Sequence, residues 1–452
     1  MSRTPLALLL ISMASGCVHY VPQPLEPAQT LSKIESRTLI DSGLRAFIES
    51  NSPEATRQWP PASWNFTNLT LAAFFFHPDL DVARAQLGIA RAAGVTAGAR
   101  PNPTVSLAPA YNTTTPPPWI LGLSLDIPVE TMGKRGYRIA QAGHLSDAAR
   151  FNLAATAWQV RSRVRKALLA FHAAVESAKL LGGQEEIQAQ SVSLLERQLQ
   201  AGAVSPFEVT QSRVALNQTR FALQDAERLA ATARVQLAES IGVPPAALDG
   251  LNLDFDSFRE FPRDLPDAAA RRQALINRAD IRAALAEYAA AQSGLQLEIA
   301  KQYPNVHLSP GYQLDQTDNK WSLGLTIELP ILNRNEGPIA EADAKRAEIA
   351  ARFNALQAQV LSQIAQAVAA YRLALRKADA AGQLSRELEK QLRTARGMLQ
   401  VGEISRVELA QREIELTAAA LAQQTAMITA QEALGFIEDA LQSPAQTTEG
   451  AK

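Results

Sequence analysis

Two long stretches of the chain repeat apolar residues in a heptad-like pattern, and in the first the intervals alternate between four and three. The first series starts at Leu153 and the second at Phe353, about 200 residues later. A mean period of 3.5 residues is typical of helices that pack side by side in a coiled coil. The pattern predicts very long helices over about 137–201 and about 337–401. At about 1.5 Å per residue, each would be on the order of 100 Å long.

Two other regions, at about 103–128 and about 304–330, alternate between apolar and polar residues, as strands do. In each hairpin, leucine and isoleucine would share one face, while small residues and one acid would share the other. The acids are Asp126 and Glu328. Such faces suit the wall of a water-filled membrane barrel, with both acids toward the lumen. A strand half-buried on a soluble core is the alternative.

Pro109 and Pro310 lie inside these predicted strands. Proline lacks the N–H that a strand ladder needs, and a closed barrel has no free edge to accommodate it. We therefore expect both prolines at β-bulges.

The whole pattern occurs twice in the chain. Three pairs of segments match at a displacement of 200 to 202 residues: 103–111 with 304–312, 121–128 with 323–330, and 200–205 with 400–405. Each unit has the order helix, two-stranded hairpin, very long helix, tight turn and second helix. The first and last helices of a unit together nearly equal the very long one in length, so they could stack end to end beside it.

The turn after each very long helix has explicit chemistry. Gly202 and Gly402 suit the left-handed residue that ends a helix. Ser205 and Ser405 suit helix N-caps, and each has a glutamate three residues later, as a capping box requires. The sequence therefore predicts two helical hairpins with sharp tips.

The N-terminus reads as a secretion signal with a short apolar core that ends at Ala14. The residues before Cys17 are small and resemble the lipobox of bacterial lipoproteins, although that motif usually has leucine where Ala14 stands. We expect Cys17 to be acylated and to become the mature N-terminus; a plain signal peptide with an incidental cysteine is the alternative. No other stretch has the roughly 18 apolar residues of a spanning helix, so strands would cross a membrane.

These features divide the chain into consecutive parts. The expected parts are a signal peptide at 1–16, a lipidated segment at 17–67 with one short helix near 31–50, repeat 1 at 68–241, a linker at 242–277 with a short helix near 266–277, repeat 2 at 278–441 and a disordered tail at 442–452.

Composition narrows the possible functions. The net charge is −1, with 44 basic and 45 acidic residues, so no nucleic-acid partner is expected. The single cysteine cannot form an intramolecular disulfide. The five histidines do not cluster at ligand spacing, and we expect no metal and no other cofactor. No phosphate loop, nucleophile elbow or zinc-protease motif is present, which argues against an enzyme.

Four strands are too few to close a barrel in a membrane, which needs at least about eight. An open sheet in lipid would leave unpaired backbone groups at its edges. The chain must therefore assemble; a dimer would supply eight strands and a trimer twelve.

The duplicated unit, over about 68–440, resembles the TolC family of outer-membrane efflux proteins. The resemblance lies in His77–Leu80, 279–281, the prolines that open and close the strands, the tips at 202–205 and 402–405, and Leu329–Gly337. His77–Leu80 and Leu329–Gly337 look most like the heavy-metal-exporting branch of the family.

This resemblance implies a mostly α fold in which three chains form a twelve-stranded β-barrel continued by a twelve-rod α-barrel. It implies an outer-membrane efflux channel that extends into the periplasm. Its partners would be two further copies, outer-membrane lipids, a periplasmic adaptor and an inner-membrane pump of the RND type. Adaptor docking would fall on the tips, at Gly202, Ala203, Ser205, Gly402 and Ser405, and the periplasmic gate on Glu408 and Gln411. The family commonly places two acids at the gate, and here Gln411 replaces the second.

Other functions remain open at this point. The same fold serves type I protein secretion and drug efflux, and the sequence does not identify the cargo. A coiled-coil structural lipoprotein without a pore is a further alternative, against which the polar strand faces argue.

Overall fold

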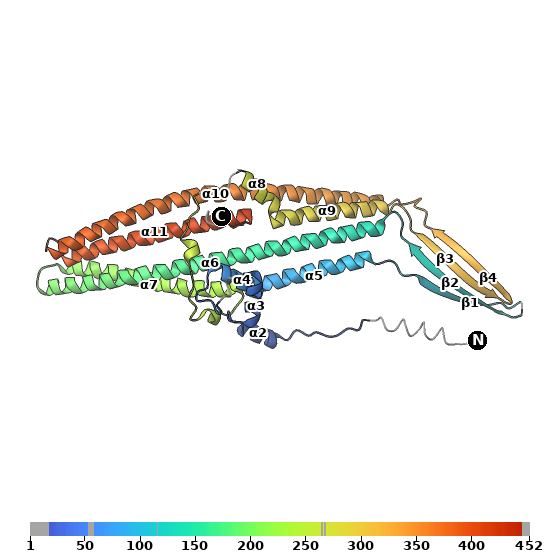
Figure 1. Cartoon of the computed structure of the whole chain (residues 1–452), viewed down its shortest axis with the longest axis horizontal. Coiled ribbons are helices and arrows are strands. Elements are labelled where there is room, and N and C mark those ends of the chain that lie inside the picture. Colours follow the sequence, from blue (N-terminus) through green and yellow to red (C-terminus); the bar gives the residue numbers. More distant parts are fainter. Residues whose placement is uncertain (1–17, 53–57, 115, 264, 266–267, 445–452) are drawn as a thin grey trace.

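The computed structural model describes residues 18–52, 58–114, 116–263, 265 and 268–444. Figure 1 shows an elongated molecule in which long helices run nearly parallel and a sheet of four strands lies at one end. Among the described residues, no helix combines the length and the apolar character that crossing a membrane requires. Cys17 and residues 445–452 of the expected tail lie outside the described part of the chain.

The predicted duplicated unit of long helices and a two-stranded hairpin is confirmed. The first unit contains α5 (Pro78–Gly98), β1 (Thr104–Tyr111), β2 (Trp119–Val129), α6 (Lys134–Gln200) and α7 (Pro206–Ile241). The second contains α9 (Ala279–Ala300), β3 (Val306–Asp315), β4 (Asp318–Ile327), α10 (Glu336–Gln400) and α11 (Arg406–Leu441). A short helix, α8 (Ala268–Asn277), precedes the second unit.

In the first unit, the two shorter helices stack end to end along the long one. Helices α5 and α7 both pack against α6, and the end of α7 meets the start of α5. At this joint Gly242 has a φ of +87°, and a β-carbon there would lie 2.8 Å from the backbone oxygen of Phe76. Arg37 joins the two ends by donating to the backbone oxygens of Phe76, at 3.0 Å, and Gly242, at 2.7 Å. Only glycine fits this position without strain.

The expectation of one short helix near 31–50 is wrong, because the structure has two helices there. They are α2 (Pro27–Glu35) and α3 (Ser42–Asn51). Asp41 accepts a hydrogen bond from the Leu44 N–H at 2.9 Å, and this N-cap starts a separate helix. A further helix, α4 (Phe66–Phe76), starts at the N-cap Asn65 and carries several fully buried apolar residues.

Two apolar clusters hold the helices together near the middle of the molecule. The larger joins α3, α4, α6 and the end of α7, and includes Trp64, Leu168 and Ile241. The smaller joins α10 and α11 around Tyr371, whose hydroxyl donates to the backbone oxygen of Pro262 at 2.9 Å. Nearer the sheet, α9 packs against α6 and α10 and buries residues such as Ala290 and Leu297.

The sheet has the strand order β1-β2-β3-β4, and all its pairs are antiparallel. The prediction of β-bulges at Pro109 and Pro310 is wrong. Pro109 pairs with Leu121 and Pro310 with Leu323, and the register is the same on both sides of each proline. Pro109 lies on an edge strand of this chain, where a missing N–H can face away from the ladder. Pro310 coincides with an interruption in the β2–β3 ladder that leaves the register unchanged.

Helix α6 of the first unit packs against α11 of the second through a largely buried polar network. The Arg165 guanidinium donates to the backbone oxygen of Gln431 at 2.8 Å and to its side-chain oxygen at 2.9 Å. Glu438 accepts from Arg161 at 3.0 Å and lies 3.5 Å from Arg165. Gln431 also donates to the backbone oxygen of Phe258, between the units, at 2.8 Å. Because a buried charge without its partner is strongly destabilising, this network fixes the alignment of the two helices.

Gly435→Ala should destabilise this joint. A β-carbon at Gly435 would overlap Nη1 of the buried Arg165, which could move only by breaking its bonds to α11. We expect a loss of about 1–3 kcal/mol, the usual cost of overpacking, measured as a lower midpoint of urea unfolding by circular dichroism. Gly183→Ala is the control: its β-carbon would have nothing within 4 Å, so the change should be neutral or stabilise by up to about 1 kcal/mol. Equal urea midpoints for the two variants would contradict the close packing of α11 against Arg165.

Candidate functional site

The two helical hairpins end in tips of the same construction, at the end of the molecule opposite the sheet (Figure 1). Gly202 has a φ of +74° and Gly402 a φ of +78°, so both take the left-handed conformation that ends a helix. The N–H of Ala203 then donates to the backbone oxygen of Gln198 at 2.8 Å. The backbone turns back within a few residues, which leaves the tip residues exposed.

Each tip has the predicted capping box. At the second tip the Glu408 N–H donates to Ser405 Oγ at 3.1 Å, and the Ser405 N–H donates to Glu408 Oε2 at 2.7 Å. Hydrogen bonds from Ser405 lower the pKa of the Glu408 carboxyl, so Glu408 is ionised at neutral pH. Ser205 and Glu208 form the equivalent box at the first tip. Both glutamates are exposed, so each carboxylate can cap its helix and still face solvent.

The surroundings of Glu408 differ from those of Glu208. Gln411 lies one turn after Glu408 and donates a long hydrogen bond, at 3.5 Å, to Glu415. Glu415 also pairs with Arg412 at 2.9 Å. Near the first tip, Phe207 is 72% exposed. The second tip is therefore richer in charge and the first presents an aromatic ring.

One face of the sheet is polar, as the sequence predicted. Asp126 Oδ2 lies 3.0 Å from His307 Nδ1, and Ser309 Oγ donates to Asp126 Oδ1 at 3.2 Å. Glu328 follows β4 by one residue and is exposed. Both acids lie near His307: Asp126 pairs with it, and Glu328 lines with it a cavity of about 380 Å³ at the base of the sheet.

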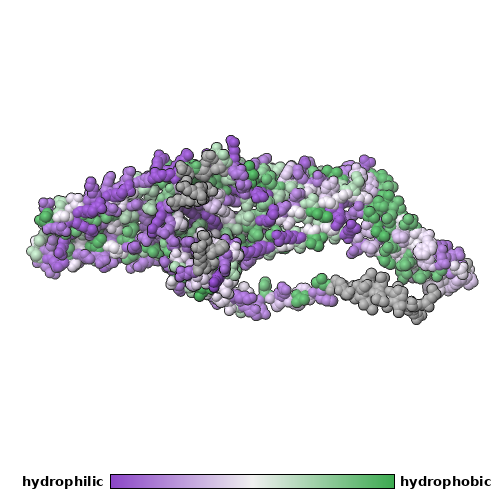
Figure 2. Space-filling model, in the orientation of Figure 1, coloured by the Kyte–Doolittle hydropathy of each residue, from purple (hydrophilic) through white to green (hydrophobic). Residues whose placement is uncertain are grey.

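The opposite face of the sheet is apolar and open. Leu123 on β2 is 47% exposed and Leu323 on β4 is 75% exposed. Figure 2 shows this apolar surface on the part of the sheet next to the helices. Aromatic pairs lie toward the hairpin ends of the strands: Tyr111 with Trp119, and Tyr312 with Trp321.

Where the sheet meets the helices, basic side chains of α6 bind the ends of the neighbouring segments. The buried Lys134 ammonium donates to the backbone oxygen of Tyr303 at 2.5 Å and to Asn305 Oδ1 at 2.6 Å. Arg138 pairs with Glu130, and this hydrogen bond lowers the pKa of the Glu130 carboxyl. These contacts were not predicted from the sequence; Arg138 ties the start of α6 to the end of β2, and Lys134 ties it to the segment between α9 and β3.

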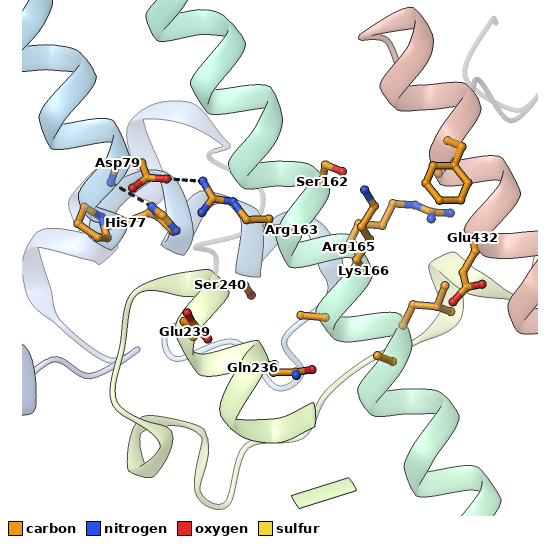
Figure 3. Close-up of a pocket in the computed structure, with 16 residues that line it drawn as sticks. His77, Asp79, Ser162, Arg163, Arg165, Lys166, Gln236, Glu239, Ser240 and Glu432 are labelled. Atoms are coloured by element: carbon orange, nitrogen blue, oxygen red, sulfur yellow. Dashed lines mark hydrogen bonds and ion pairs between the residues drawn. The ribbon is translucent and has the colours of Figure 1, made fainter. Parts of the chain in front are cut away.

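A cavity of about 640 Å³ lies near the middle of the rods, where α5, α6, α7 and α11 meet (Figure 3). On one side Arg163 pairs with Asp79 at 2.5 Å, and this bond lowers the pKa of the Asp79 carboxyl. His77 is buried beside them, and burial lowers the pKa of its imidazole. On the other side Lys166 reaches Asp439 of α11 at 3.2 Å.

Sequence reasoning missed this cavity and the polar network beside it. The one local signal is His77–Leu80, whose first three residues line the cavity. In the described residues, no cluster of three or more histidine, cysteine or acidic side chains could hold a metal ion. The expected lipidation site, Cys17, falls outside those residues.

Comparisons with known proteins agree with the architecture. The family model described as outer membrane efflux protein matches residues 76–243 and 270–437. The cobalt-zinc-cadmium resistance protein CzcC of Cupriavidus metallidurans is 30% identical over 222 residues, which are 48% of this chain and 52% of that protein. The match thus spans about half the length of this curated relative.

Three solved structures have the same fold. VceC of Vibrio cholerae, an outer membrane protein, has a TM-score of 0.67 at 22% identity, covering 84% of this chain and 97% of that one. MtrE of Neisseria gonorrhoeae, an outer membrane channel in its open state, has a TM-score of 0.70 at 18% identity, covering 84% and 91%. CusC has a TM-score of 0.68 at 19% identity, covering 84% and 92%. The family model covers both repeats, and the chain belongs to the outer membrane efflux protein family.

Proposed function

We propose that three copies of the chain form a passive exit duct for an efflux system, across the outer membrane and through the periplasm. The sheet supports this most directly, because one face is polar and the other is exposed and apolar, at one end of long helical rods. A wall between lipid and water needs these two faces. Family membership places the chain among outer membrane efflux proteins.

The number of strands supports a trimer. Four strands per chain would give twelve in a closed barrel, and two long helices with their stacked partners would give a twelve-rod tunnel. In lipid the edges of β1 and β4 must be paired, and closure by identical copies satisfies both.

We propose heavy-metal cations as the cargo, delivered by a periplasmic adaptor and an inner-membrane pump of the RND type. The support is the 30% identity to a protein named for cobalt, zinc and cadmium resistance. The chain has five histidines and five methionines, which do not form a selective metal site in the described residues. Selection of the cargo would then belong to the pump, and Asp126 and Glu328 would only give the barrel lumen an acidic lining.

We place a gate at the second tip, with Glu408 and Gln411 at the narrow mouth. Three Glu408 carboxylates in a trimer would attract cations and repel anions there. Since Glu208 makes the same capping box, it is an internal control for the effect of capping alone.

Glu408→Gln should reduce the cation preference of single channels in planar bilayers and change their conductance. The amide can keep the hydrogen bond to the Ser405 N–H while it removes the charge. Glu208→Gln should leave both quantities unchanged. If the two variants behave like the unsubstituted protein, Glu408 is a helix cap without a role in permeation.

The tips would dock the adaptor through Gly202, Ala203, Ser205, Gly402 and Ser405. They are exposed, compact and far from the sheet, where an adaptor from the inner membrane would arrive. Substitution of either glycine would strain the turn whatever the docking, because both have positive φ.

Ala203→Trp therefore tests docking better, since the backbone at Ala203 does not require glycine. The bulky ring should weaken co-purification of the adaptor from the same organism at least tenfold, while trimers form normally. Ala203→Ser should bind the adaptor normally. Normal adaptor binding by Ala203→Trp trimers would remove the docking role from this tip.

Cys17 would carry lipid and anchor the mature chain to the outer membrane. Mass spectrometry of the mature protein should find an acylated Cys17 as its first residue. Because the barrel would hold the protein in the membrane too, Cys17→Ser should lower the yield in the outer membrane more than the conductance of each channel. An unmodified Cys17, or cleavage at another position, would contradict the anchor.

A further inference from the structure

His307 of β3 lies between the two acids of the polar sheet face. Its carboxylate neighbour on the β2 side is Asp126, whose Oδ2 is 3.0 Å from Nδ1 of the imidazole. On the β4 side His307 is opposite Thr326, and Glu328 comes two residues after Thr326, which puts it on the same face. The two acids are counterparts in the repeat, 202 positions apart. The order β2-β3-β4 therefore places equivalent acids on both sides of one histidine.

The bond to Asp126 fixes which nitrogen of His307 carries the hydrogen. A carboxylate has no hydrogen to donate, so Nδ1–H is the donor and Asp126 the acceptor. Ser309 Oγ donates to the same carboxylate at 3.2 Å and helps to hold it in place. The lone pair is then on Nε2, which has no hydrogen-bond partner among the residues that the structure describes. A histidine that binds a metal commonly has its other ring nitrogen bound to a carboxylate in this way.

Glu328 is the second group available to a cation here. It lines, together with His307, the cavity of about 380 Å³ at the base of the sheet. Its carboxylate is exposed and makes no hydrogen bond or ion pair with another described residue, although its charge acts on the nearby Lys134. Diagonal neighbours on adjacent strands are about 7–8 Å apart, within reach of long side chains. Glu328 can therefore bring its carboxylate to a cation held by Nε2 of His307.

The basic side chains of this cavity already have oxygen partners. Lys134 donates to two oxygens of the segment between α9 and β3, at 2.5 and 2.6 Å. Arg138 is paired with Glu130. Lys301 is paired with Glu298 at 2.7 Å. These pairs offset the positive charge that would otherwise repel a cation, and they leave the Glu328 carboxylate available.

We propose that His307 Nε2 and Glu328 bind a divalent transition-metal cation such as Zn²⁺, and that Asp126 is a positioning residue that orients the imidazole. Water completes the coordination, because no group of three or more histidine, cysteine or acidic side chains in the described residues can hold a metal ion. An imidazole nitrogen favours Zn²⁺ over Mg²⁺ and Ca²⁺, which prefer sites made of oxygen atoms alone. The binding stands on these residues, whereas its place on the path of the cargo rests on the proposed function.

A site with only two protein ligands suits the wall of a duct. Conduction requires binding that is favourable enough for the ion to enter and weak enough for it to leave. A closed site with four protein ligands would retain the cation instead. The side chain of His307 is 40% exposed, so a hydrated cation can reach and leave it directly. In the proposed trimer, three such sites would lie around the junction of the barrel and the tunnel.

The first unit has no equivalent of this site. The counterpart of His307 is Ser106, which lies on β1 opposite Ser124. Neither hydroxyl is a strong ligand for a transition metal, since such cations favour imidazole, thiolate and carboxylate groups. We therefore expect one site in each chain.

Calorimetric titration of the purified full-length protein with Zn²⁺, at neutral pH and in excess Mg²⁺, tests the site. His307→Gln should weaken Zn²⁺ binding at least tenfold, because it removes the nitrogen ligand without removing a carboxylate. Asp126→Ala should weaken binding about tenfold, the usual effect of removing a carboxylate that orients a histidine ligand. Glu328→Gln should weaken it about threefold or more. His144→Gln, on α6, is the matched control and should leave Zn²⁺ binding unchanged.

The outcomes separate the site from the proposed duct. Equal Zn²⁺ affinity for His307→Gln and the unsubstituted protein would overturn the site, as would equal weakening by His144→Gln. Competition by Mg²⁺ at the same concentration as Zn²⁺ would overturn the assignment to transition metals. If the same protein still forms conducting channels in planar bilayers, these results leave the duct intact. Zn²⁺ binding that depends on His307, in a protein that forms no channels, would support the site and overturn the duct.

Discussion

Backbone hydrogen bonding at the sheet edges is the constraint on which the rest of the structure depends. The order β1-β2-β3-β4 leaves one edge on β1 and the other on β4, and lipid cannot satisfy the unpaired N–H and C=O groups of either. A closed ring of copies is the arrangement that removes both edges. Each copy then continues into rods on which α7 and α10 also expose apolar residues, among them Phe221 and Leu373.

The duplication explains how one chain meets this constraint. The β2–β3 ladder and the seam of α6 against α11 join the two units in the same way along the whole length of the molecule. The buried Arg165 network secures the joint that must form within each chain. Within one chain the outer faces of the two units stay open, and Phe221 of α7 and Leu373 of α10 are exposed there.

Sequence patterns predicted the features that have a strict period or a local signature. The heptads gave both long helices to within a few residues, and the capping boxes at Ser205 and Ser405 are present as expected. Long-range contacts were not predictable in this way. The pairing of Arg165 with Gln431 joins residues far apart in the sequence, and nothing local marks it. The bulges expected at Pro109 and Pro310 are absent, because β1 has a free side at Pro109 and the β2–β3 ladder is interrupted at Pro310.

Single-particle electron microscopy of the full-length protein in lipid nanodiscs tests most directly whether three copies enclose one continuous lumen from the sheet to the tips. We expect a particle with threefold symmetry, a barrel within the disc and a single helical tunnel that projects from one side. A monomeric or dimeric particle, or a threefold particle without a lumen between its chains, would contradict it.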